Sequence, residues 1–144
     1  MQGLLGVGAA LILLTDIHHV LPVAAVWLAE DRQIVLDLGS LWTVARVQVN
    51  GQDAGMLWKA PYRLEVTGLL QPGANALMVE VANTWSNRLV GDASLPASER
   101  VARTNITRSG TPGLPWSEVP LHESGLLGPV QLVPRQVVHI SLSQ

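Results

Sequence analysis

The chain has 144 residues, of which 48% are hydrophobic and 14% charged, and its formal net charge is −2. This length suffices for one domain with a buried core, while the low charge and the lack of any Lys/Arg cluster argue against nucleic acid as a partner. Because the sequence contains no cysteine, it offers no disulfide, no thiolate zinc site and no cysteine nucleophile.

Residues 1–32 form an atypical apolar segment, with one apolar run at Leu4–Leu14 and a second at Val20–Ala29. The first run is too short for a membrane span but has the length of the apolar part of a signal peptide. No Lys or Arg precedes Arg32, whereas a secretory signal normally begins with basic residues. Three interpretations stay open: a leader of a periplasmic or secreted protein, an element that packs on the domain, or a tail.

Residues 33–144 are interpreted as one all-β domain, because hydrophobic and polar residues alternate with the period of half-buried strands. Asn50-Gly51 predicts a tight hairpin turn, and Gln71–Asn75 carries a second turn signal. Two last short strands are expected within Pro129–Leu142, split at Pro134-Arg135. Close spacing of such strands predicts an antiparallel β-sandwich. The alternating residues expected to share strand faces are Ile34, Leu36 and Leu38; Ala45, Val47 and Val49; Tyr62, Leu64 and Val66; and Leu77, Val79 and Val81.

The segment from Thr84 to Pro120 lacks a regular pattern, and long loops inside a compact domain usually carry a binding site or an interface. Its side chains are of the types that bind sugars. An indole ring stacks on the apolar face of a pyranose, while amide, guanidinium and carboxylate groups bond to its hydroxyls. The candidate carbohydrate-binding residues are Trp85, Asn87, Arg88, Asp92 and Trp116.

Several of these aromatic and polar residues also have a structural interpretation. Arg88 and Asp92 can form a salt bridge that fixes the loop and leaves only Asn87 for a ligand. The loop can instead face a catalytic domain, which would make it an interface. Of the aromatics near the hairpin, Trp58 is expected to pack beneath the Asn-Gly turn, and Tyr62 is expected to be structural.

The sequence offers no recognisable catalytic or metal-binding set. Hydrolysis of a glycoside needs two carboxyl groups about 5–10 Å apart across one sugar, but no spacing singles out a pair among the loop carboxylates. His18 and His19 are adjacent, so on a strand they would point to opposite faces. We therefore expect no catalytic residue, no metal and no cofactor in this chain. The carboxylates considered are Asp92, Glu99, Glu118 and Glu123.

Six short motifs occur in order between Ile34 and Leu132. They are Leu36-Asp-Leu-Gly39, Asn50-Gly51, Gly55-Met-Leu-Trp58-Lys-Ala-Pro-Tyr62, Leu70-Gln-Pro-Gly-Ala-Asn75, Asn83-Thr-Trp-Ser-Asn-Arg-Leu-Val-Gly-Asp92 and Ser124-Gly-Leu-Leu-Gly-Pro-Val130. With these motifs the sequence resembles the sugar-binding β-sandwich of family-two-type glycoside hydrolases, and is most similar to the C-terminal module of bacterial α-L-rhamnosidases.

The resemblance implies a galactose-binding-like jelly roll that accompanies a catalytic barrel and has no catalytic residues of its own. Residues 1–32 contain no equivalent of the first strand of those modules. We expect a non-catalytic domain that holds a plant-type polysaccharide or oligosaccharide near the barrel of an α-L-rhamnosidase-like enzyme. The alternative is a module that only braces the barrel. A sheet edge left open by the missing strand further predicts a dimer.

Overall fold

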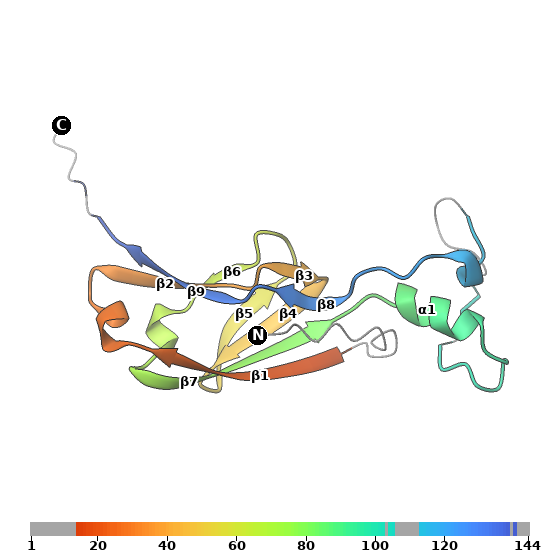
Figure 1. Ribbon diagram of the computed structural model, residues 1–144, viewed down its shortest axis with the longest axis horizontal. Helices are drawn as coiled ribbons and strands as arrows, with labels where there is room; N and C mark the ends of the chain where they lie inside the picture. The colour runs from red at the N-terminus through yellow and green to blue at the C-terminus, as the bar shows by residue number, and fades with distance from the viewer. Residues whose placement is uncertain (1–13, 103, 106–112, 139, 141–144) are drawn as a thin grey trace.

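The computed structural model describes residues 14–102, 104–105, 113–138 and 140. These residues form a nearly all-β structure of two larger antiparallel sheets and a two-stranded ribbon, with one α-helix in the described part. Figure 1 shows the strands side by side in layers, with the helix beyond one end of them. The predicted antiparallel β-sandwich is confirmed. The jelly-roll connectivity stays a prediction.

The first sheet contains four antiparallel strands. Their spatial order is β1 (Leu14–Val23), β7 (Gly73–Ala82), β4 (Val44–Val49) and β5 (Gln52–Leu57). Asn50 and Gly51 join β4 to β5 with φ angles of 52° and 76°. Two positive φ angles at the central positions are the requirement of the tightest hairpin turns, which Asn-Gly meets best. The predicted Asn-Gly hairpin is confirmed.

The second sheet has three strands, and the ribbon has two. The sheet order is β6 (Arg63–Glu65), β2 (Arg32–Asp37) and β9 (Gln131–Gln136), and the ribbon pairs β3 (Ser40–Trp42) with β8 (Gly125–Gly128). The expected split at Pro134-Arg135 is wrong, because β9 runs through both residues. Since β9 lies at the edge of its sheet, Pro134 can lack a backbone donor without breaking an inner ladder.

The remaining helical elements are short. They are the 3₁₀ turns η2 (Ala25–Leu28), η3 (Thr67–Leu69) and η4 (Trp116–Glu118), and the helix α1 (Ser86–Ala93). No helix in the described part of the chain is long and apolar enough to cross a membrane.

The core lies between the two larger sheets and follows the predicted alternation. Leu36 of β2, Val47 of β4 and Val81 of β7 are completely buried, whereas their neighbours Arg46 and Glu80 are exposed or half-buried. Tyr62 is half-buried and packs against this core, as expected. Trp58, in contrast, is 70% exposed, so its expected place beneath the hairpin is wrong. It follows buried Leu57, and adjacent residues of extended chain point to opposite sides.

The inference that a first strand is missing from residues 1–32 is wrong, because β1 lies ahead of β2 in the chain and pairs with β7 along its whole length. Ile17 and Leu21 pack against the core, and Val23 is buried. The alternation of β1 is hard to recognise in the sequence because a polar residue, His19, occurs in the series of positions that otherwise face the core. His19 lies opposite Leu77 and is exposed. Residues 1–13, which include most of the first apolar run, lie outside the described residues.

Three pairs of the sequence motifs meet in the fold and tie its loops together. Asn50 and Asn75 are the first pair, with 2.8 Å between Asn50 Nδ2 and Asn75 Oδ1. The second pair is Gly39 and Gly128, whose backbones approach closely. A Cβ on Gly39 would lie 2.4 Å from the carbonyl carbon of Gly128, so there is no room for a side chain at Gly39. The amide of Gly125 donates to Asn83 Oδ1 at 2.7 Å, the third tie. Much of the motif pattern therefore has a structural cause.

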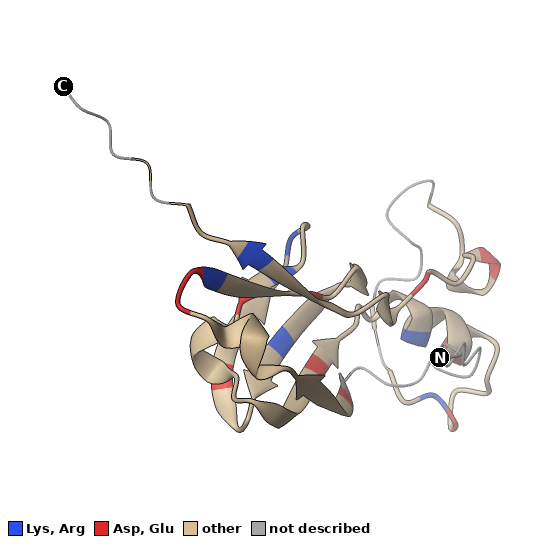
Figure 2. Cartoon of the chain, turned by 60° about the vertical axis from the view of Figure 1, so that its left-hand side comes forward, with Lys and Arg blue, Asp and Glu red and all other residues tan. Residues whose placement is uncertain are grey.

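Charged residues are dispersed along the described chain, with acidic and basic positions interspersed (Figure 2). Two exposed ion pairs illustrate the mixture: Arg46 with Asp53 at 3.3 Å, and Arg63 with Asp37 at 2.7 Å. Such pairs contribute little to stability because water screens them.

Candidate functional site

Helix α1 begins where the predicted site begins, and an internal ion pair holds it. Arg88 donates from Nε to Asp92 Oδ2 at 3.0 Å and from a terminal nitrogen to Asp92 Oδ1. Both side chains are buried, with 7% and 4% exposed. A cation that precedes an anion by four residues is the less favourable order along a helix. Contacts with the rest of the fold must therefore stabilise this ion pair.

Asp92 supplies that tertiary contact, because its Oδ2 also accepts the backbone amide of Ala102 at 2.6 Å. Burial raises the pKa of the Asp92 carboxyl, but the hydrogen bonds from Ala102 and Arg88 outweigh burial, and the pKa lies below its ordinary value. The side chain is thus a carboxylate at neutral pH and anchors the loop that follows α1. This confirms the alternative in which Arg88 and Asp92 form a salt bridge.

Asn87 is likewise engaged within the protein. Its Nδ2 donates to the His122 carbonyl oxygen at 2.7 Å, and its Oδ1 accepts the His122 amide at 2.8 Å. The His122 ring in turn stacks on Trp42 of β3, with 6.4 Å between ring centroids and 19° between planes. Asn87 therefore links α1 to the segment that returns to the sandwich, and only 8% of the residue is exposed.

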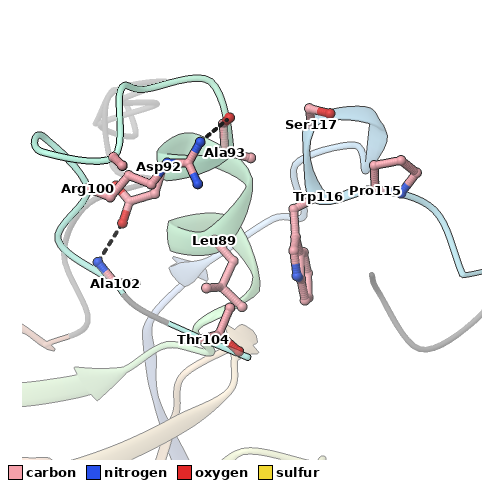
Figure 3. Close-up of a pocket in the computed structure, with 10 residues that line it drawn as sticks. Leu89, Asp92, Ala93, Arg100, Ala102, Thr104, Pro115, Trp116 and Ser117 are labelled. Atoms are coloured by element: carbon pink, nitrogen blue, oxygen red, sulfur yellow. Dashed lines mark hydrogen bonds between the residues drawn. The ribbon is translucent and has the colours of Figure 1, made fainter. Parts of the chain in front are cut away.

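A cleft of about 640 Å³ lies between α1 and the turn η4 (Figure 3). Sites for small molecules usually measure about 300–1,000 Å³, a range that includes the volume of this cleft. In Figure 3 the indole of Trp116 faces Leu89 across the cleft, and Arg100 lies at the end of the helix. The apolar lining residues are Leu89, Ala93, Ala97, Ala102, Pro115 and Trp116, and the polar ones are Asp92, Arg100, Thr104 and Ser117.

Arg100 is turned toward the carbonyl end of α1. Its Nε donates to the Leu95 carbonyl oxygen at 2.8 Å, and a terminal nitrogen donates to that of Ala93 at 3.4 Å. Basic side chains commonly bond to the last carbonyls of a helix, where they also compensate the negative end of its dipole. The side chain therefore shapes one rim of the cleft by capping α1.

The structure brings only part of the predicted set to one place. Trp116 and Asp92 line the cleft, whereas Asn87 and Arg88 are not part of its lining and have their polar groups bonded to the protein. Trp85 precedes α1, is 55% exposed and is not part of the cleft lining. The other three carboxylates considered above, Glu99, Glu118 and Glu123, are exposed.

Several cleft residues could not be singled out in the sequence. Leu89 looks like any apolar residue, and Arg100, Thr104 and Ser117 belong to no motif. Asp92 and Asn87 bond to Ala102 and His122, which connects the irregular segments that carry these residues to α1. The one available signal is Pro115 next to Trp116, an aromatic in a proline-containing loop.

The chain is similar to known proteins in sequence and in fold. No protein-family model matches the chain. A protein of Formosa agariphila with the provisional name beta-glucuronidase is 38% identical in an alignment of 132 residues that covers 80% of this chain and 11% of that protein. The solved rhamnosidase from Novosphingobium sp. PP1Y superposes with a TM-score of 0.71 and 35% identity, over 85% of this chain and 11% of that one. A solved beta-glucuronidase from an uncultured Clostridium sp. has 26% identity and a TM-score of 0.44, over 51% of this chain and 13% of that one.

The β-sandwich with its appended helix is thus similar to one domain of much larger glycoside hydrolases. More specifically, the predicted resemblance to a rhamnosidase domain is confirmed in sequence and in fold. The chain spans 11% of the length of both the curated relative and the solved rhamnosidase.

Proposed function

We propose that the chain acts as a non-catalytic accessory domain of an α-L-rhamnosidase-like glycoside hydrolase and binds carbohydrate in the cleft between α1 and η4. The observation that supports this role is the position of Trp116. Its indole forms one wall of a cleft of suitable size, and Thr104 and Ser117 are among the other lining residues. An aromatic face beside hydroxyl groups is the combination that holds a pyranose.

In this proposal the polar residues of the predicted site have a different task from the aromatic one. Asn87, Arg88 and Asp92 fix the backbone around the cleft, since their side chains already bond to protein groups. Trp116 contacts the sugar, and exposed Trp85 offers a second stacking surface outside the cleft. Binding acts by position: it raises the local concentration of a polysaccharide near a catalytic barrel without chemistry of its own.

The test is a titration of the isolated chain with rhamnose, galactose and a pectin-derived oligosaccharide, followed by two-dimensional amide NMR. We expect saturable shifts around Trp116 and Ser117, and their loss in Trp116→Ala. Trp58→Ala is the matched control, because Trp58 is more exposed but follows β5 and is not part of the cleft lining. A dispersed spectrum that no sugar changes would refute carbohydrate binding.

The second candidate is a module that braces the catalytic barrel without binding sugar. It is favoured by Trp85, a large apolar side chain that is 55% exposed next to polar groups that are engaged internally. A partner protein surface would cover such a side chain. This candidate predicts that Trp85→Ser weakens association with the Novosphingobium rhamnosidase from which the matching domain is deleted. Equal association of both forms would contradict bracing through Trp85.

A further inference from the structure

The hairpin turn at Asn50-Gly51 carries a residue pair that favours spontaneous deamidation. In an unfolded chain the backbone nitrogen of a glycine attacks the side-chain carbonyl carbon of a preceding asparagine, because glycine has no Cβ to hinder the approach. The attack closes a succinimide ring and expels ammonia, and water then opens the ring to give aspartate or isoaspartate. Gly51 is exposed, so water has access to the turn.

The folded protein holds the Asn50 side chain in a position that opposes this reaction. Its amide nitrogen donates to the Leu69 carbonyl oxygen at 2.9 Å and to Asn75 Oδ1 at 2.8 Å, which uses both amide hydrogens. Its Oδ1 accepts the Ala76 amide at 2.9 Å. The side-chain carbonyl carbon can reach the Gly51 nitrogen only after this amide group rotates. Ammonia can leave only after both donor bonds break.

Asn75 is a firm anchor for this arrangement because the protein fixes it in turn. It is 1% exposed, its Oδ1 also accepts the Gln71 amide, and its Nδ2 donates to the carbonyl oxygens of Gln71 and Gly73. The backbone of Asn50 is restrained as well, since its amide donates to the Ala76 carbonyl oxygen at 2.8 Å. Opening of the Gln71–Asn75 turn would therefore release the Asn50 side chain.

We propose that Asn50 is a latent deamidation site that Asn75 keeps closed, and that local opening of the Gln71–Asn75 turn exposes it without unfolding of the whole domain. The product cannot restore the lost contacts. A carboxylate has no hydrogen to donate, so it would face two acceptors, the Leu69 carbonyl oxygen and Asn75 Oδ1. Isoaspartate also inserts an extra methylene group into the main chain of the hairpin. Deamidation thus removes the side-chain contacts that join this hairpin to the Gln71–Asn75 turn.

The experiment incubates the full chain at mildly alkaline pH and follows the mass of the proteolytic peptide that contains Asn50. Deamidation in the folded chain should be at least about ten times slower than in urea, since three hydrogen bonds at the low end of their usual range correspond to about that factor. Asn75→Ala removes one of these bonds and should speed the reaction in the folded chain by about two to ten times.

Gly39→Ala is the matched control. It destabilises the fold at the contact with Gly128 and leaves the hydrogen bonds of Asn50 in place. Both variants are incubated under conditions in which circular dichroism shows them to be folded, and Gly39→Ala should keep the slow rate of the parent chain. Asn50→Asp has the same structure as one reaction product. In urea unfolding it should lower the ratio of folded to unfolded chain by about tenfold.

Four results would overturn the inference. An unchanged Asn50 in the urea-unfolded chain would show that the pair does not deamidate. Equal rates in the folded and unfolded chain would show that the hydrogen bonds give no protection. An unchanged rate in Asn75→Ala would exclude Asn75 as the residue that closes the site. Equal acceleration by Asn75→Ala and Gly39→Ala would show that the reaction requires unfolding of the whole domain.

Discussion

Replacement of Asn75 by Ala should destabilise the fold far more than a typical surface substitution. The residue is 1% exposed, and its side chain makes four hydrogen bonds. Oδ1 accepts from Asn50 Nδ2 and from the Gln71 amide, each at 2.8 Å. Nδ2 donates to the carbonyl oxygens of Gln71 at 2.8 Å and of Gly73 at 3.1 Å.

The magnitude follows from these bonds. A hydrogen bond contributes a net value of about 0.5–1.5 kcal/mol, and the lower part of this range applies here because water can reach the exposed turn once Asn75 is truncated. Four bonds at about 0.5–1 kcal/mol give a loss of about 2–4 kcal/mol in the free energy of unfolding. That is a large part of the roughly 5–15 kcal/mol by which domains are stable.

The assay is urea unfolding, followed by tryptophan fluorescence and by circular dichroism. Asn105→Ala is the matched control, since Asn105 is exposed, and it should change stability by less than about 0.5 kcal/mol. Asn50→Gly keeps the left-handed backbone at φ 52° and removes the partner side chain. In the double variant Asn50→Gly, Asn75→Ala, the loss in the free energy of unfolding should be about 1 kcal/mol smaller than the sum of the two single losses, because the two side chains share a hydrogen bond. A loss below about 1 kcal/mol for Asn75→Ala would refute the reasoning.

Three further predictions follow from other contacts. The folded-state pKa of Asp92 lies below its ordinary value of 3.8, so the stabilisation by its ion pair is present above that pH and is lost as the pH falls through the lower, folded-state value. In Asp92→Asn, the free energy of unfolding should therefore fall less steeply with decreasing pH than in the parent chain. Gly39→Ala should cost at least about 2 kcal/mol in urea unfolding, because the new Cβ meets the backbone of Gly128 and φ is +67°, while Gly68→Ala, where a Cβ meets nothing within 4 Å, should be tolerated. The dimer through an open sheet edge stays a prediction; β1 is such an edge, so Val20→Lys should shift light-scattering masses toward the monomer, and a parent chain that is monomeric at every concentration would contradict it.

The sandwich could be predicted from the sequence because its signals are local. Alternation along β4 and β7 assigns inward positions without knowledge of the partner strands, and these positions are the buried ones. Asn50-Gly51 specifies its own turn. The split predicted at Pro134 is wrong because proline breaks an inner strand but is tolerated at an edge, and edge position is a property of the whole sheet.

The candidate site was less predictable because its elements depend on distant residues. Helix α1 has only eight residues, too few for a stable helix in isolation, and contacts with Ala102 and His122 hold it in place. Those contacts consume the polar groups of Asn87 and Asp92, the side chains that most resembled sugar ligands in the sequence. A motif of sugar-binding residue types can thus be a motif of loop anchors.

This distinction changes how the motif between Asn83 and Asp92 should be understood. Asn83, Asn87 and Asp92 each bond to the backbone of a later segment, at Gly125, His122 and Ala102. Replacing any of them would therefore disturb the cleft indirectly, and a loss of sugar binding in such a variant would not identify a ligand contact. Substitutions at Trp116 and Leu89 test the cleft itself, because these side chains form its facing walls.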